Sequence, residues 1–106
     1  MFFELRQYRI KSKQRERWVR FMEEKILPFH VSRGIVVVGS FISPGKEDLY
    51  VWIRRFESEE ERARYAKEVA ESDYWKKELL PQIDEMMDRL AMQVTRLEAT
   101  PKSVLQ

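Results

Sequence analysis

Three charged residues and a group of aromatic residues are the side chains of this sequence best suited to chemistry. Glu4, Arg6 and Arg54 bring one carboxylate and two guanidinium groups, a set that suits an acidic ligand. The same residues form a satisfied ion-pair network if they meet inside an interface between two copies, and we favour this second interpretation. Aromatic residues on the same strands are candidates for lining a ligand pocket or for interface packing, of which packing is favoured: Tyr8, Tyr50 and Trp52.

His30 is the only histidine in the chain, and it lies near the C-terminal end of the first predicted helix. An imidazole at this position is suited to act as a general base or as a haem ligand. A partly buried structural histidine is the more ordinary interpretation, and we favour it. If the protein is catalytic, His30 and Tyr8 are the candidate acid–base groups.

Several common kinds of site are excluded by counts of residue types. One histidine and no cysteine leave no ligand set for a multi-histidine or zinc–thiolate metal site. No glycine-rich phosphate loop and no nucleophile elbow occurs. The acidic run at residues 59–61 indicates the start of a helix rather than a metal site. We therefore expect no metal and no cofactor.

The composition is that of one soluble globular domain. The chain has 106 residues, of which 43% are hydrophobic and 36% are charged, so it is not expected to be disordered. No apolar run is long enough for a membrane span, and a strand pattern follows Met1 directly, so we expect no membrane contact and no signal peptide. The absence of cysteine favours a cytoplasmic location. The net charge of +2 is evenly interspersed, which makes nucleic acid an unfavoured partner.

The spacing of apolar residues predicts four strands and three helical segments. Alternation predicts strands over residues 2–10, 35–42, 49–56 and 91–98. Helical spacing predicts segments over residues 14–32 and 59–71, and a third from residue 73 to Leu90. Pro28 and Pro81 each interrupt a helical segment, so a kink or restart is expected at both. Trp18 and Trp75 are expected to anchor the core between helices and sheet.

The resulting order is β-α-β-β-α-β, with the second helical stretch broken in two. This order predicts an α+β fold of the ferredoxin-like type, a four-stranded antiparallel sheet with helices on one face. We expect a single domain over residues 1–100 and a loose C-terminal tail over residues 101–106.

Because the helices cover one face of the sheet only, the assignment of faces decides how the protein assembles. We assign to the helix-covered face Phe3, Leu5, Val51 and Ile53. The other face then carries Glu4, Arg6, Arg54 and the aromatic residues Tyr8, Tyr50, Trp52 and Phe56. An aromatic patch of this size exceeds what a monomer normally leaves exposed. We therefore predict a homodimer, with two sheets packed face to face through this second face.

Three short stretches carry a resemblance to a known family: residues 4–8 (ELRQY), residues 50–58 (YVWIRRFES) and residues 73–75 (DYW). In their order and spacing they resemble the NIPSNAP family of the dimeric α/β-barrel superfamily, over nearly the whole chain. The resemblance implies a ferredoxin-like fold and a barrel formed by two sheets. Two departures limit it: Ser12-Lys13 replaces a frequent Pro-Gly, and Trp52 replaces a histidine of some members, so that histidine's role is not carried over.

The wider superfamily includes cofactor-independent monooxygenases, isomerases and haem proteins, usually with a pocket between sheet and helices. The activity of NIPSNAP members themselves is poorly defined. We therefore expect a homodimeric α/β-barrel protein of undefined biochemical role that binds a small, mostly apolar ligand between sheet and helices. A cofactor-independent monooxygenase or isomerase is the alternative. An RNA-binding module is the lesser alternative, because such domains share the order of elements but have a glycine-containing strand signature that is absent here.

Overall fold

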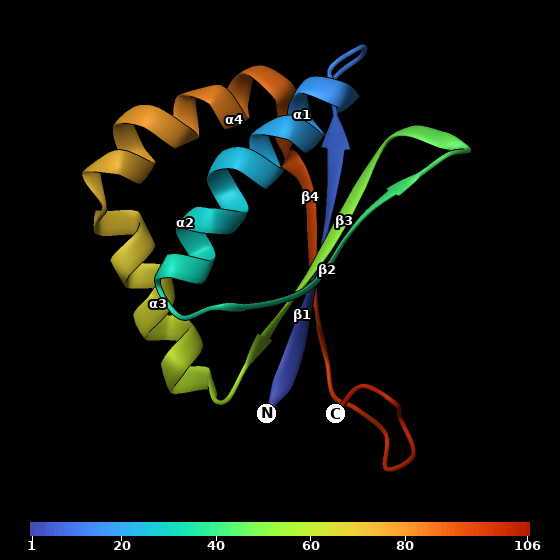
Figure 1. Cartoon of the computed structure of the whole chain (residues 1–106), viewed down its shortest axis with the longest axis vertical. Helices are drawn as coiled ribbons and strands as arrows, with labels where there is room; N and C mark the ends of the chain where they lie inside the picture. Colours follow the sequence, from blue (N-terminus) through green and yellow to red (C-terminus); the bar gives the residue numbers. More distant parts are fainter.

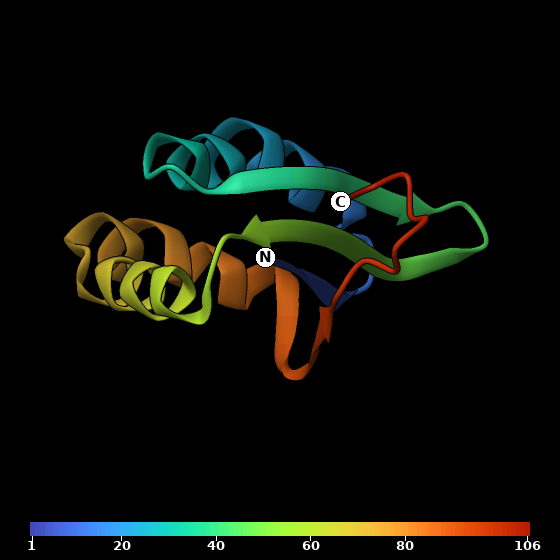
Figure 2. The same cartoon turned by 90° about the horizontal axis from the view of Figure 1, so that it is seen from below.

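One antiparallel sheet with helices on one of its faces makes up the protein. The computed structural model describes residues 1–106. The sheet has four strands in the order β2-β3-β1-β4, namely β1 (Phe2–Ile10), β2 (Val36–Ser43), β3 (Lys46–Phe56) and β4 (Met87–Leu97). All helices lie on the same side of this sheet (Figure 1; Figure 2). The arrangement is α+β and ferredoxin-like, as predicted.

Two helical stretches cover the sheet, one between β1 and β2 and the other between β3 and β4, and they are called the first and second helical layers here. The first layer is one continuous helical rod with a π-helical segment in its middle. It runs from α1 (Arg15–Phe21) through the π-helical segment Met22–Ile26 into α2 (Leu27–Ser32). Pro28 lies at the start of α2. Proline has no N–H to donate and its ring crowds the preceding turn, so a wider turn before it relieves both problems. The predicted interruption near Pro28 is therefore confirmed.

The second layer begins with α3 (Glu59–Glu71), whose start follows from local side-chain chemistry. The Ser58 side chain accepts a hydrogen bond from the Glu61 backbone N–H at 3.1 Å. The Glu61 carboxylate in turn accepts one from the Glu57 backbone N–H at 3.3 Å. These contacts satisfy backbone donors that have no partner within the helix, so the predicted start of α3 is confirmed.

After α3 the second layer repeats the pattern of the first. A π-helical segment, Tyr74–Leu79, leads directly into α4 (Leu80–Met86), and Pro81 lies at the start of α4. Both layers therefore have an interruption just before a proline, as the sequence predicted. No helix of the chain has the length and apolar content needed to cross a membrane.

Two glycines make the connections around β2 possible. Gly34 ends the first layer with φ of 84°, a left-handed conformation that favours glycine. Gly39 lies beside a bulge, because the pairing of β2 with β3 shifts between Val37 and Gly39. A Cβ atom on Gly39 would lie 2.5 Å from the ring of Phe41, so the ring occupies the space that a side chain would need.

The assignment of the sheet faces from the sequence is wrong, because the two faces are exchanged. The face covered by helices carries Glu4, Arg6, Tyr8, Tyr50, Trp52, Arg54 and Phe56. The open face carries Phe3, Leu5, Val51 and Ile53. Trp52 is 2% exposed and Phe56 is fully buried within a single chain. The larger aromatic side chains fill the deep space beneath the helices, which the smaller aliphatic residues would leave underpacked.

The last helix ends earlier than predicted, and β4 begins earlier. Met86 closes α4, whereas Leu90, which was predicted to be helical, lies in β4 and is 98% exposed. The register of β4 against β1 jumps between Gln7 and Arg9, so extra residues of β4 form a wide bulge. Figure 2 shows this part of β4, in orange, turning away from the sheet. Leu90 continues the helical spacing of the apolar residues of α4, which is why the sequence predicted a longer helix than the structure has.

Candidate functional site

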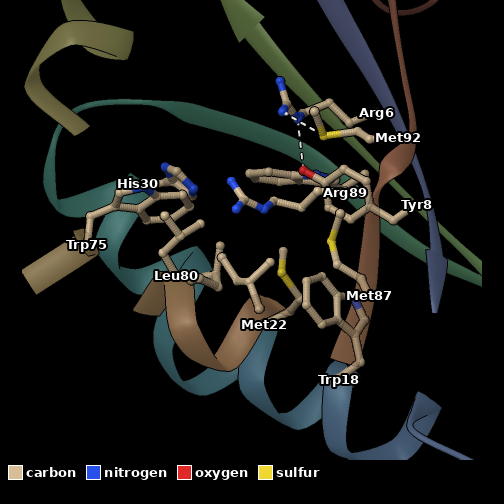
Figure 3. A pocket seen from close by; sticks show the side chains of 13 residues that line it. Arg6, Tyr8, Trp18, Met22, His30, Trp75, Leu80, Met87, Arg89 and Met92 are labelled. Carbon is tan, nitrogen blue, oxygen red and sulfur yellow. Dashed lines mark hydrogen bonds between the residues drawn. The ribbon is translucent and has the colours of Figure 1, made fainter. Parts of the chain in front are cut away.

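Two adjacent cavities lie between the sheet and the helices. The first has a volume of about 240 Å³ and is bounded by β1, β3 and β4 and by both helical layers (Figure 3). The second has a volume of about 250 Å³ and reaches α3. The two cavities share the wall residues Arg6, Tyr8, His30, Trp52 and Trp75. A hollow therefore exists in the place where the sequence led us to expect a ligand pocket.

The Tyr8 hydroxyl occupies the floor that the two cavities share. It accepts one hydrogen bond from Arg6 Nε at 2.8 Å and another from Trp52 Nε1 at 2.8 Å. These residues lie on paired strands, since Arg6 faces Trp52 across β1 and β3. With both acceptor positions of its oxygen in use, Tyr8 has its own proton free to donate to a bound molecule.

A carboxylate and two arginines meet beside this hydroxyl. Oε1 of Glu4 accepts hydrogen bonds from Arg6 Nη1 at 2.7 Å, from Arg54 Nε at 3.1 Å and from Arg54 Nη2. Burial raises the pKa of Glu4, but Arg54 and Arg6 outweigh it, so this pKa lies below its ordinary value. The predicted ion-pair network exists, yet it lies beneath the helices of one chain rather than at a dimer interface. It keeps one positive charge in excess.

His30 extends from α2 into the wall between the cavities. It is 3% exposed, its ring lies 5.1 Å from that of Trp52 and 5.4 Å from that of Tyr65, and its Nδ1 has no hydrogen-bond partner. Burial, followed by Arg54, Arg6 and Arg33, lowers the pKa of His30 to about 3. The imidazole is therefore neutral at neutral pH and is a weak base, although it can still donate or accept a hydrogen bond.

Three buried side-chain polar atoms have no hydrogen-bond partner: Trp18 Nε1, His30 Nδ1 and Tyr65 Oη. Trp18 lines the first cavity, Tyr65 lines the second and His30 lines both. Buried polar groups in proteins are nearly always paired, so a cluster of exceptions needs an explanation. The three atoms are themselves buried, so it is other atoms of these side chains that line the cavities.

Most of the residues that the sequence singled out meet at these cavities. Arg6, Tyr8, His30, Trp52 and Arg54 are wall residues, and Glu4 lies behind two of them.

Tyr50 is the exception among these candidates. It packs against Trp18 and Tyr8 and forms a hydrogen bond with Ser40, and it lines neither cavity. Because Tyr8, Tyr50 and Trp52 are buried beneath the helices, they are also unavailable for stacking on RNA bases.

Sequence reasoning missed several wall residues, among them the polar residues Arg62, Tyr65 and Arg89. Tyr65 precedes Val69 by four residues on α3, and both are buried, so their helical spacing was a usable signal. Arg89 was missed because the third helical segment was predicted to continue through Leu90. Trp18 and Trp75, which were expected to be core anchors, do pack in the core and also line the first cavity.

Comparisons with known proteins agree on one family. Residues 3–102 match the family model described as NIPSNAP. A NIPSNAP family protein with unknown function from Agrobacterium tumefaciens is similar in structure, with 24% identity, coverage of 100% of this chain and 94% of that chain, and a TM-score of 0.89. An uncharacterized NIPSNAP domain protein from Burkholderia xenovorans has 16% identity, coverage of 97% and 98%, and a TM-score of 0.84.

A more distant structural neighbour is an antibiotic biosynthesis monooxygenase. It has 14% identity, coverage of 95% of this chain and 100% of that chain, and a TM-score of 0.66. This likeness extends to the fold alone. No curated protein matches the sequence.

Proposed function

The chain belongs to the NIPSNAP family, and we propose that it binds a small, mostly apolar molecule in the cavities between its sheet and its helices. Of the 13 residues that line the first cavity, 10 are hydrophobic. Its volume of about 240 Å³ lies just below the range of roughly 300–1,000 Å³ found for pockets that bind drug-sized ligands. The occupant is therefore small.

The observation that carries this proposal is the composition of the wall of the first cavity. Beside its 10 hydrophobic residues, this wall has three polar ones, Arg6, His30 and Arg89. An apolar wall with a few convergent polar groups is typical of a small-molecule site, because those groups orient the ligand.

Tryptophan fluorescence provides a direct test, because all three tryptophans of the chain line the first cavity. Titration with small aromatic compounds, among them benzoate and benzyl alcohol, is expected to give saturable quenching with at least one of them. Leu80→Phe places extra volume in this cavity and should abolish the response. Val31→Phe makes the same kind of change at a side chain that is 58% exposed on α2, and should have no effect. Absence of saturation with every compound would overturn the proposal.

A second candidate function is proton-transfer catalysis of the isomerase type. The observation that suggests it is the Tyr8 hydroxyl, which two hydrogen bonds hold in place at the cavity floor. His30, with its pKa lowered to about 3, is a poor choice for the base. Cofactor-independent oxygenation in the same pocket is the other form of this candidate, suggested by a neighbour of the same fold that is an antibiotic biosynthesis monooxygenase.

Deuterium exchange tests the catalytic proposal. Phenylpyruvate in deuterated water loses its exchangeable carbon-bound protons, and NMR follows the loss. The protein is expected to accelerate this exchange, and Tyr8→Phe is expected to remove the acceleration while leaving the circular dichroism spectrum unchanged. Equal rates with the wild type and the variant would count against a role for Tyr8.

We also propose that two copies pair through the open face of the sheet, as in a dimeric α/β barrel. Val36, Phe41 and Leu97 lie on this face and are 51%, 52% and 40% exposed, beside the half-buried Val51 and Ile53. An apolar face of this kind favours a partner sheet. It is the opposite face from the one predicted from the sequence.

Light scattering over a range of concentrations tests the dimer. A particle of twice 12.9 kDa is expected for the wild type, and Val51→Glu should reduce it to the monomer. Lys67→Glu, on the exposed side of α3, is the matched control and should remain dimeric. A wild-type protein that stays at 12.9 kDa at every concentration would refute this assembly.

A further inference from the structure

We infer that the molecule bound in these cavities is an anion, a small apolar body carrying one carboxylate or a similarly acidic oxygen group. This inference rests on the proposed binding function and adds the chemical class of the ligand. It starts from the charges of the cavity walls, which contain no aspartate or glutamate. The walls do contain four arginines: Arg6, Arg54, Arg62 and Arg89.

None of the carboxylates that pair with these arginines lines either cavity. Glu4 pairs with Arg6 and Arg54, Glu59 pairs with Arg62, and Asp84 pairs with Arg89. The four wall arginines are therefore paired with only three carboxylates. In the whole chain, by contrast, the 20 basic and 18 acidic residues are nearly balanced. Because the negative charges stand farther from the cavities than the positive ones, the potential inside the cavities is positive.

One of the N–H donors of Arg6 has only a weak hydrogen-bond acceptor within the protein. Its Nε donates to Tyr8 and its Nη1 donates to Glu4, whereas its Nη2 donates to the thioether sulfur of Met92 at 3.2 Å. A thioether is a weak acceptor, and the Arg6 side chain is only 19% exposed, so water does little to compensate. Figure 3 draws this contact above the first cavity, which both residues line. A carboxylate oxygen in that cavity would replace a weak acceptor with a charged one.

Arg89 supplies a second cation at the outer part of the same cavity. The wide bulge of β4 carries it, its side chain is 50% exposed, and its Nε donates to Asp84 at 2.6 Å. Since Arg6 is largely buried and Arg89 is half-exposed, a ligand that enters past Arg89 reaches Arg6 with its charged group. The apolar body then packs against the aromatic and aliphatic wall residues Trp52, Trp75 and Leu80.

The test compares benzoate with benzamide, two probes of nearly the same shape that differ in charge. Fluorescence titration of the wild-type protein should give a dissociation constant for benzoate at least about tenfold lower than that for benzamide. Arg89→Gln should weaken benzoate severalfold and leave benzamide unchanged. Arg9→Gln is the matched control, because Arg9 is also about half-exposed and ion-paired, with Asp48, but lines neither cavity, and it should change neither constant.

The outcomes separate this inference from the function on which it rests. If benzamide binds as tightly as benzoate, or if Arg9→Gln and Arg89→Gln act alike, the ligand class is wrong and the binding function stands. If neither these probes nor any other compound of the aromatic panel gives saturable quenching, both are overturned. The partner of Arg89, Asp84, is 47% exposed, so the Arg89→Gln variant leaves no buried charge without a partner and is expected to fold.

Discussion

The buried neutral His30 makes the stability of the protein depend on pH in a predictable direction. Its pKa is about 3 in the folded chain and about 6.5 when the chain is unfolded. Between these values the unfolded chain binds a proton that the folded chain does not, so acid favours unfolding. The stabilisation is therefore fully present above pH 6.5 and is lost as the pH falls towards 3. From pH 7 to pH 5 this linkage removes about 2 kcal/mol from the free energy of unfolding.

Urea denaturation at pH 7, 6 and 5 measures this effect. The chain has one histidine, so no other histidine titrates in this interval. His30→Phe keeps an aromatic ring among Phe29, Trp52 and Tyr65 but cannot take up a proton. The wild type is expected to lose about 2 kcal/mol more than this variant from pH 7 to pH 5, a sizeable part of the roughly 5–15 kcal/mol typical of a domain. Parallel pH dependences for the two proteins would refute the reasoning.

Three further substitutions test the fold. Trp52→Glu should prevent folding, because it buries an unpaired charge at a site that is 2% exposed, and circular dichroism would show the loss of structure. Gly34→Ala should cost about 1 kcal/mol, since φ of 84° is unfavourable for alanine although nothing lies within 4 Å of a Cβ there; thermal denaturation would detect it. Ser58→Ala should also cost about 1 kcal/mol by removing the cap of α3, and urea denaturation would contradict this if the midpoint did not move.

The order and type of the elements could be predicted because each one has a local cause. Alternating residues give β1 its bounds, Ser58 and Glu61 give the start of α3, and Pro28 and Pro81 give the interruptions of the two helical layers. Each of these signals depends only on residues a few positions apart, so it can be recognised in the sequence without knowledge of the tertiary structure.

The orientation of the sheet could not be predicted from the same signals. A period of two residues shows that Tyr50 and Trp52 share a face, but it does not show which face the helices cover. The charged residues Glu4 and Arg54 suggested an exposed or interface position, whereas they satisfy each other beneath the helices. Charge was therefore a misleading guide to burial here, because a paired charge can be buried.

The candidate site was predicted in part. Arg6, Tyr8 and Trp52 could be grouped because they lie on one face of two strands, and the pairing of β1 with β3 brings them together. The spacing of Tyr65 and Val69 on α3 could have marked Tyr65 as buried, but its place in the cavity wall depends on how α3 packs. The place of Arg89 depends on the register jump in β4, and neither of these is a local property.

The two π-helical segments have a consequence for how this fold diversifies. A π-helical turn accommodates one residue more than an α-helical turn, so it absorbs an extra residue within its wider turn. His30 follows the first such segment, Leu80 and Ile83 follow the second, and all three line the first cavity. A relative that lacks the extra residue would have a regular α-helical turn at that place, with the later side chains still directed at the cavity, so the length of these helices can change without changing the wall.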